Sequence, residues 1–222
     1  MRPIQNAGGH VGLTARSYPI AADTAITAGQ VVKLAAGFVV SAAANESGAV
    51  LGVAGENHPG VADVLNTRAN GREILVYDNP GLLFECPVPR IKAQSGTATT
   101  VAAKTGELAA SVADGGYSDG VLQLCAKAAS SANPDSVGKC YRVTGYTKTG
   151  TVLTRESGGA PSAGDEFRLY PAIGSTVGAL DTARQKLIVS ATGATSLRVV
   201  GHDYERGMIR CMAVKHALAS ST

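Results

Sequence analysis

Short apolar stretches separated by glycine, proline and asparagine turns dominate the hydrophobic pattern of this chain. The clearest pair is 31–34 and 38–41, which flank Ala36-Gly37 and predict a tight β-hairpin. Further strands are expected over 49–55, 73–77, 82–88, 121–125, 139–146 and 208–214. Helical signals are weak and confined to 178–186 and the C-terminal end. The pattern therefore predicts an all-β fold, mainly β with a few short helices, made of hairpin-rich small barrel or sandwich modules.

Parts of this pattern recur along the chain. The order strand, glycine turn, strand, polar loop, apolar strand occurs over 27–55 and again over 100–125. Residues 163–169 resemble 28–34, and 196–202 resemble 50–56, more in pattern than in identity. An internal repeat is one interpretation, and the chance similarity of glycine-turn β proteins is the other.

The same pattern suggests four segments. Residues 1–22 contain no acidic residue and no strand or helix period, which predicts an extended N-terminal arm. A β domain over 23–130, barrel-like or clip-like, is expected to follow. Residues 131–138 are small and polar around Pro134 and predict a linker. A second β domain is expected over 139–222.

Composition narrows the functional classes. Charged residues make up only 17% of the chain and aromatics 5%, with no Trp, so much of the apolar content is small. A core of small residues buries little area, which favours a protein that also buries surface against partners. The net charge of +3 and the scattered Lys and Arg residues predict no nucleic-acid partner. We find no signal-peptide pattern and no apolar run long enough to span a membrane.

One motif resembles that of a hydrolase. Residues 116–120 read Gly-Tyr-Ser-Asp-Gly, which fits the nucleophile elbow G-x-S-x-G, and Asp203 and His216 follow Ser118 in the matching order. That elbow needs a buried strand before the serine and a helix after it. Here a loop precedes Ser118 and a strand-like segment follows, so a glycine-rich β loop is the preferred interpretation.

The remaining candidates for chemistry are weaker. Residues 145–150 imitate the start of a phosphate loop, but the lysine that contacts phosphate is missing, which favours a hairpin turn. His202, Asp203 and Glu205 are close in sequence and could bind a metal. A zinc site needs three well-placed ligands, and this cluster offers no strong third one. The four cysteines are widely spaced without CxxC, and Cys86 and Cys125 are expected to be buried in strands as reduced thiols. We therefore expect no cofactor, no metal and no enzymatic activity.

Residues 26–34, 37–42 and 50–54 together resemble the capsid decoration (cement, head-stabilising) proteins of tailed phages. The shared pattern is a turn, G-x-V-V-x-L, a glycine, V-V-x-A, a loop and then G-V-A. The resemblance covers about 20–90 well, and 95–130 and 160–216 only by pattern. It carries no catalytic residue.

This resemblance implies a virion protein that is made in the host cytoplasm and bound to the outer capsid surface. There it would bridge major capsid protein subunits, its expected partner, and associate with itself as a dimer or trimer. The expected contacts to the capsid or to other subunits come mainly from the arm: Arg2, Ile4, His10, Leu13, Arg16 and Tyr18. The alternatives are another virion β protein, such as a tail, fibre or glycan-binding module, and a serine hydrolase that uses Ser118.

Overall fold

In the computed structural model, the described residues form only strands, turns and loops. The described residues are 2–6, 13–20, 24–42, 48–60, 73–88, 90–108, 114–181, 186–188, 197–214 and 216–218. The predicted all-β fold is confirmed. The helices suggested around 178–186 and at the C-terminal end do not occur among these residues: β16 covers part of the first, and a bridge and a turn lie at 216–218. No helix in the described part of the chain is long and apolar enough to cross a membrane.

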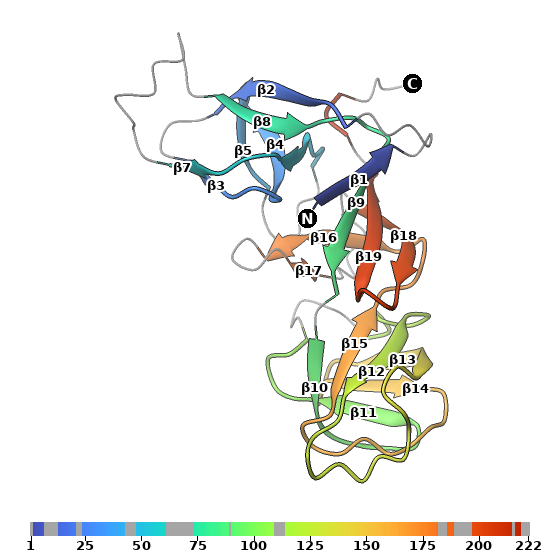
Figure 1. The fold of residues 1–222 in the computed structure, drawn as a ribbon. Helices are drawn as coiled ribbons and strands as arrows, with labels where there is room; N and C mark the ends of the chain where they lie inside the picture. The colour runs from blue at the N-terminus through green and yellow to red at the C-terminus, as the bar shows by residue number, and fades with distance from the viewer. Residues whose placement is uncertain are drawn as a thin grey trace.

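A six-stranded antiparallel sheet occupies the middle of the molecule (Figure 1). In spatial order its strands are β1 (Arg2–Asn6), β9 (Leu82–Pro87), β19 (Met208–Ala213), β18 (Leu197–Asp203), β16 (Thr176–Asp181) and β17 (Lys186–Ile188). The sheet therefore joins strands from both ends of the chain.

A five-stranded sheet, called here the curled sheet, lies at one end of the molecule (Figure 1). Its order is β2 (Ala15–Pro19), β8 (Glu73–Tyr77), β6 (Gly52–Ala54), β4 (Val31–Ala35) and β5 (Phe38–Ser41). A bridge between Ile20, just after β2, and Val39 in β5 brings its two edges together. A small pair, β3 (Ala25–Ile26) and β7 (His58–Pro59), accompanies it.

A closed six-stranded barrel forms the other end (Figure 1). Around the barrel the strands are β10 (Arg90–Thr97), β11 (Thr100–Ala103), β14 (Val152–Arg155), β13 (Cys140–Thr147), β12 (Val121–Ala126) and β15 (Glu166–Tyr170). The chain enters through β10 and leaves through β15, and these two strands pair with each other. Residues 90–170 are therefore a module inserted between β9 and β16 of the central sheet.

This topology corrects the expected domain boundaries. Residues 131–138 connect β12 to β13, which pair with each other inside the barrel, so they do not link two domains. A domain over 23–130 would end halfway around the barrel, and one over 139–222 would begin there. The structure instead divides the chain into the inserted barrel and an outer part made of the segments before and after it.

The segment expected to be a free arm contributes two edge strands. β1 pairs with β9 at the edge of the central sheet, and β2 pairs with β8 in the curled sheet. Main-chain pairing thus holds both segments on this chain's own sheets. Residues 7–12, which connect them, lie outside the described residues.

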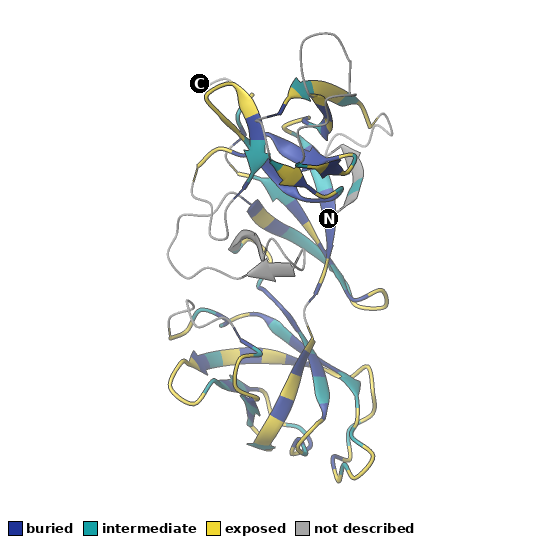
Figure 2. Ribbon diagram, turned by 90° about the vertical axis from the view of Figure 1, so that its left-hand side faces the viewer, coloured by how far each residue is buried: buried dark blue, intermediate teal, exposed yellow. Residues whose placement is uncertain are grey.

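Alternation along the strands places the core. Figure 2 shows buried and exposed positions alternating along the barrel strands, as expected for strands that expose one face to solvent. Much of the aromatic content gathers here, with Tyr117, Tyr141, Tyr146, Phe167 and Tyr170 all buried. The barrel core is therefore less thin than the overall composition suggested.

One of the proposed internal similarities, between 28–34 and 163–169, corresponds to a shared local structure. The turns before β4 and β15 each place a glycine at positive φ, Gly29 at 85° and Gly164 at 88°. In both turns the glycine N–H donates over 2.8 Å to an alanine carbonyl in the neighbouring strand, Ala54 and Ala93 respectively. The similarity over 100–125 is not of this kind, because β11 forms its hairpin with β10 and residues 104–108 are turns and bends.

Candidate binding surfaces

The three residues of the hydrolase motif are not brought together. Ser118 lies in the turn at 114–119 of the barrel, where its N–H donates to Gly115 O. Asp203 ends β18 and accepts a hydrogen bond from the Arg206 N–H. His216 is buried and bridges to Val50, beside the curled sheet at the other end of the molecule. The interpretation of 116–120 as a β loop is confirmed.

The other motif residues have structural partners. Residues 148–151 form the turn between β13 and β14, so the hairpin interpretation of 145–150 is also confirmed. Both ring nitrogens of His202 are engaged: Nε2 lies 2.7 Å from Pro171 O, and Nδ1 lies 2.9 Å from the Tyr204 hydroxyl. Burial lowers the pKa of this ring. Within the described part of the chain, no three His, Cys, Asp or Glu side chains gather as metal ligands.

The cysteines differ in environment. Cys86 and Cys211 are fully buried, Cys125 is half-buried and Cys140 is exposed. Burial raises the pKa of the Cys125 thiol, which disfavours a reactive thiolate at this position. The predicted burial of Cys86 is confirmed, and that of Cys125 is only partial.

Four of the six expected contact residues lie in strands of two sheets, two in β1 and two in β2. Arg16 and Tyr18 lie in β2 and both reach the buried carboxylate of Asp78: Arg16 Nε is 3.7 Å from it, and the Tyr18 hydroxyl donates to it. Burial and this carboxylate raise the pKa of Tyr18. Leu13, just before β2, is 37% exposed. The structure thus ties Tyr18 to its own sheet and leaves Leu13 accessible.

The other three expected contact residues are Arg2, Ile4 and His10, which precede β2 in the chain. Arg2 and Ile4 belong to β1, and their side chains lie outside the described part of the structure, as does all of His10. The strand register places Arg2 opposite Glu85 of β9. Glu85 is 2% exposed and binds Arg206 in a bidentate pair at 2.8 and 2.9 Å. The position of Arg2 is therefore next to an internal carboxylate.

An exposed surface that the sequence interpretation did not single out is the end of the β4–β5 hairpin. We call it the hairpin tip, and it consists of Leu34, Ala35, Ala36, Gly37 and Phe38. Leu34 is 37% exposed and Phe38 46% exposed, and the three residues between them are exposed as well. Leu34 pairs with Val39 and Ala35 with Phe38, so the two large side chains leave opposite faces of the hairpin. The tip is a narrow apolar projection.

The turn at the tip has an unusual residue for its geometry. Ala36 and Gly37 have φ values of 49° and 84°, as a two-residue type I′ turn requires. Asn, Asp or Gly normally occupies the first of these positions. A Cβ in the left-handed region costs about 1 kcal/mol, which glycine avoids and which Asn and Asp offset by local side-chain hydrogen bonds. The chain instead has alanine, which keeps the tip free of polar side chains. The sequence signal was available: an Ala-Ala-Gly turn with large apolar residues on both sides.

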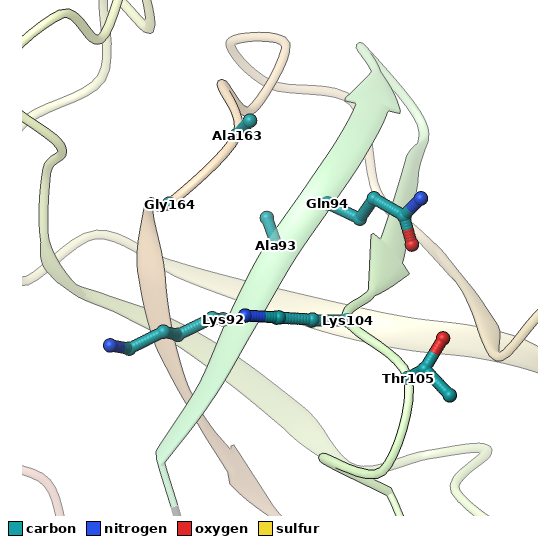
Figure 3. Close-up of a pocket in the computed structure, with 7 residues that line it drawn as sticks. All are labelled: Lys92, Ala93, Gln94, Lys104, Thr105, Ala163 and Gly164. Atoms are coloured by element: carbon teal, nitrogen blue, oxygen red, sulfur yellow. The ribbon is translucent and has the colours of Figure 1, made fainter.

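A second surface is a groove on the barrel with a cavity volume of 470 Å³. We call it the barrel groove, and Figure 3 shows the residues that line it: Lys92, Ala93, Gln94, Lys104, Thr105, Ala163 and Gly164. Ala93 from β10 lies in the middle, the turn at 163–164 borders one side, and Lys104 and Thr105 border the other. Four of the seven residues have polar side chains, and two of those carry positive charge.

Comparison with family models, curated proteins and solved structures found no match. The surfaces described above and the resemblance in residues 26–54 are therefore the features that bear on function.

Proposed function

We propose that this protein is a capsid decoration protein that binds the outer surface of an icosahedral phage shell and bridges its major capsid protein subunits. The resemblance to such proteins lies in residues 26–54, which form β3, β4, β5 and β6. The glycine of its G-V-A pattern, Gly52, has a physical role in this fold. A Cβ at Gly52 would lie 2.0 Å from the Tyr77 carbonyl oxygen, so only glycine lets β6 approach β8.

The observation that carries the proposal is the hairpin tip, because it belongs to the same segment. Exposed apolar side chains on a projecting hairpin are typical of a contact with a partner. Burying the exposed parts of Leu34 and Phe38 would contribute about 1 kcal/mol each. That is a weak contact for one subunit, but a symmetric shell repeats it, and linked subunits gain from each neighbour.

The shape of the protein suits this role. The curled sheet carries the tip, and the barrel lies at the opposite end of the molecule (Figure 1). A copy that binds through the tip therefore holds its barrel away from that contact. Self-association as a dimer or trimer remains part of the proposal, since it would place several tips on the shell at once.

Binding to capsids tests the proposal. Expanded particles assembled from the major capsid protein that is encoded with this chain would be mixed with purified wild-type protein and sedimented. The double variant Leu34→Ser, Phe38→Ser should lose affinity by about tenfold or more, which corresponds to roughly 1.4 kcal/mol. Particles saturated with wild-type protein should also withstand a higher temperature before they open.

The matched control is Leu75→Ser, because Leu75 lies in β8 of the same sheet and is also 37% exposed. This variant should bind as well as the wild type. Equal binding by the tip variant and the control would remove the tip from the contact, and no binding by any form would reject the capsid role. Deleting residues 1–22 would be a poor test, because it removes β1 and β2 from two sheets.

A further inference from the structure

The barrel groove arises where β10 changes partners. Residues Arg90 to Lys92 pair with β15, and β10 pairs with β11 from Ala93 onward. A register shift between Ala93 and Ser95 marks a bulge at Gln94. Such bulges reorient side chains and are frequent at the rims of barrels, beside binding sites. The two partner strands diverge here, and the groove lies between the turns at 104–105 and 163–164.

The polar groups in the groove are mostly hydrogen-bond donors. Lys104 supplies an ammonium group that reaches toward β10, Gln94 an amide and Thr105 a hydroxyl, while the Lys92 side chain runs to the opposite side and pairs with Glu166 (Figure 3). Among the described residues that line it, none carries a carboxylate or an aromatic ring. The carboxylate of Glu166 lies just outside, 3.6 Å from Lys92 Nζ and 3.2 Å from Arg90 Nη1, so it neutralises only part of the local positive charge. The arrangement favours an anionic ligand that also carries hydroxyl groups.

The main chain around the groove is already hydrogen-bonded. Ala93 N–H donates to Asp165 O over 2.8 Å, Ala93 O accepts from the Gly164 N–H, and the Lys104 N–H donates to Lys92 O. A peptide therefore cannot add here as an extra strand, which is the usual way an extended acidic segment binds to a sheet. The absence of an aromatic ring in the groove also disfavours a nucleobase, which needs a stacking partner. Recognition must come from the four polar side chains.

We propose that the barrel groove binds an acidic saccharide, a sugar unit that carries a carboxylate or a sulfate. The Lys104 ammonium group would pair with the acidic group, Lys92 would add positive charge nearby, and Gln94 and Thr105 would bind ring hydroxyls beside the small residues Ala93, Ala163 and Gly164. A volume of 470 Å³ is within the range of small-ligand pockets and suits one or two sugar units. This site is distinct from the hairpin tip and lies in the inserted barrel, so capsid binding is not required for it.

Titration of the full-length protein at low salt tests this inference. The probes are tetragalacturonate, which carries only carboxylates, a neocarratetraose sulfate, which carries only sulfates, neutral cellotetraose and pentaglutamate, with affinity measured by calorimetry and the site by amide NMR. Either acidic saccharide should bind with a Kd on the order of 10 μM to 1 mM, while cellotetraose and pentaglutamate should bind at least about tenfold more weakly. The two acidic arms distinguish carboxylate from sulfate.

Variants distinguish binding in the groove from nonspecific attraction to surface charge. Lys104→Gln should weaken the acidic saccharide by about five- to tenfold, and Gln94→Ala with Thr105→Val should weaken it similarly without changing the salt dependence. Lys148→Gln removes an exposed lysine from the β13–β14 turn of the same barrel and should have no effect. Equal binding of pentaglutamate, equal losses in the Lys148 variant, or no binding of either acidic saccharide would overturn the inference.

Discussion

At the scale of single residues, the most constrained polar group is the carboxylate of Asp165. It is fully buried and accepts hydrogen bonds of 3.0–3.3 Å from four groups: Ala128 N, Ser131 Oγ, Asn133 Nδ2 and Ser162 N. Burial alone would raise the pKa of Asp165, but these donors stabilise the charged form and the pKa lies below its ordinary value. This one side chain thus fastens the connection between β12 and β13 to the start of β15.

We expect Asp165→Asn to destabilise the barrel by about 2–3 kcal/mol at neutral pH, because an amide cannot accept from all four donors. A lowered folded-state pKa contributes stability above the ordinary carboxyl range, and this is lost as the pH falls through the folded value. The difference between wild type and variant should therefore be largest at neutral pH and shrink in strong acid. Urea unfolding followed by near-ultraviolet circular dichroism at several pH values measures it.

The control for this prediction is Asp119→Asn. Asp119 pairs with Arg142 at 2.6 Å, but both side chains are more than 60% exposed, so the pair should contribute little. A loss in the Asp165 variant that stays constant down to strongly acidic pH would contradict the role of the charge.

At the scale of elements, the β4–β5 hairpin has an unfavourable backbone conformation at its turn, where Ala36 lies at positive φ. Ala36→Asn keeps the left-handed conformation with a residue that tolerates it, so we expect the protein to gain about 0.5–1 kcal/mol. The midpoint of urea unfolding measures the change. Ala35→Asn places the same residue on the neighbouring exposed strand position and should give no gain. If Ala36→Asn is more stable yet binds capsids less well, the alanine serves the contact and not the fold.

A gain in stability from Ala35→Asn equal to that from Ala36→Asn would show that the turn conformation is not the cause. A loss of stability in Ala36→Asn would show that the type I′ geometry at 36–37 does not limit this hairpin.

At the scale of the whole molecule, the barrel is an insertion with adjacent entry and exit strands. Its closed sheet and its own buried aromatic residues should allow residues 90–170 to fold alone. The separated barrel would lose the contacts of Tyr170 with Tyr204 and His202, whose ring centroids lie 4.8 and 5.3 Å away. We expect the separated barrel to unfold cooperatively, at a lower midpoint than in the full chain. Its free energy of unfolding should be smaller by about 1 kcal/mol or more.

The fragment 23–130 is the matched comparison, because it follows the boundaries that composition alone suggested. It contains β10, β11 and β12 without their partners β13, β14 and β15, so it should fail to fold cooperatively. A folded 23–130 together with an unfolded 90–170 would contradict the insertion.

Local features of the sequence determined much of what was predicted correctly. The hairpin at 31–41, the turn at 148–151 and the turns at Gly29 and Gly164 depend on neighbouring residues, because a tight turn is set by the few φ angles that its own residues allow. Strand alternation likewise reports burial directly. The all-β fold and the strands β4, β5, β6, β8, β9, β12, β13 and β19 therefore followed from the chain alone, whereas β1, β2 and β10 did not.

Tertiary structure decided which strands pair and which surfaces stay open. Residues 131–138 have the composition of a linker, but a carboxylate about thirty residues further along the chain, at Asp165, holds Ser131 and Asn133 in place. The barrel groove likewise joins β10, the turn after β11 and the turn before β15, which no local pattern connects. Pairing between distant strands depends on the summed packing of the core, so the sequence by itself determined the elements, and only the folded molecule determined their partners and the sites between them.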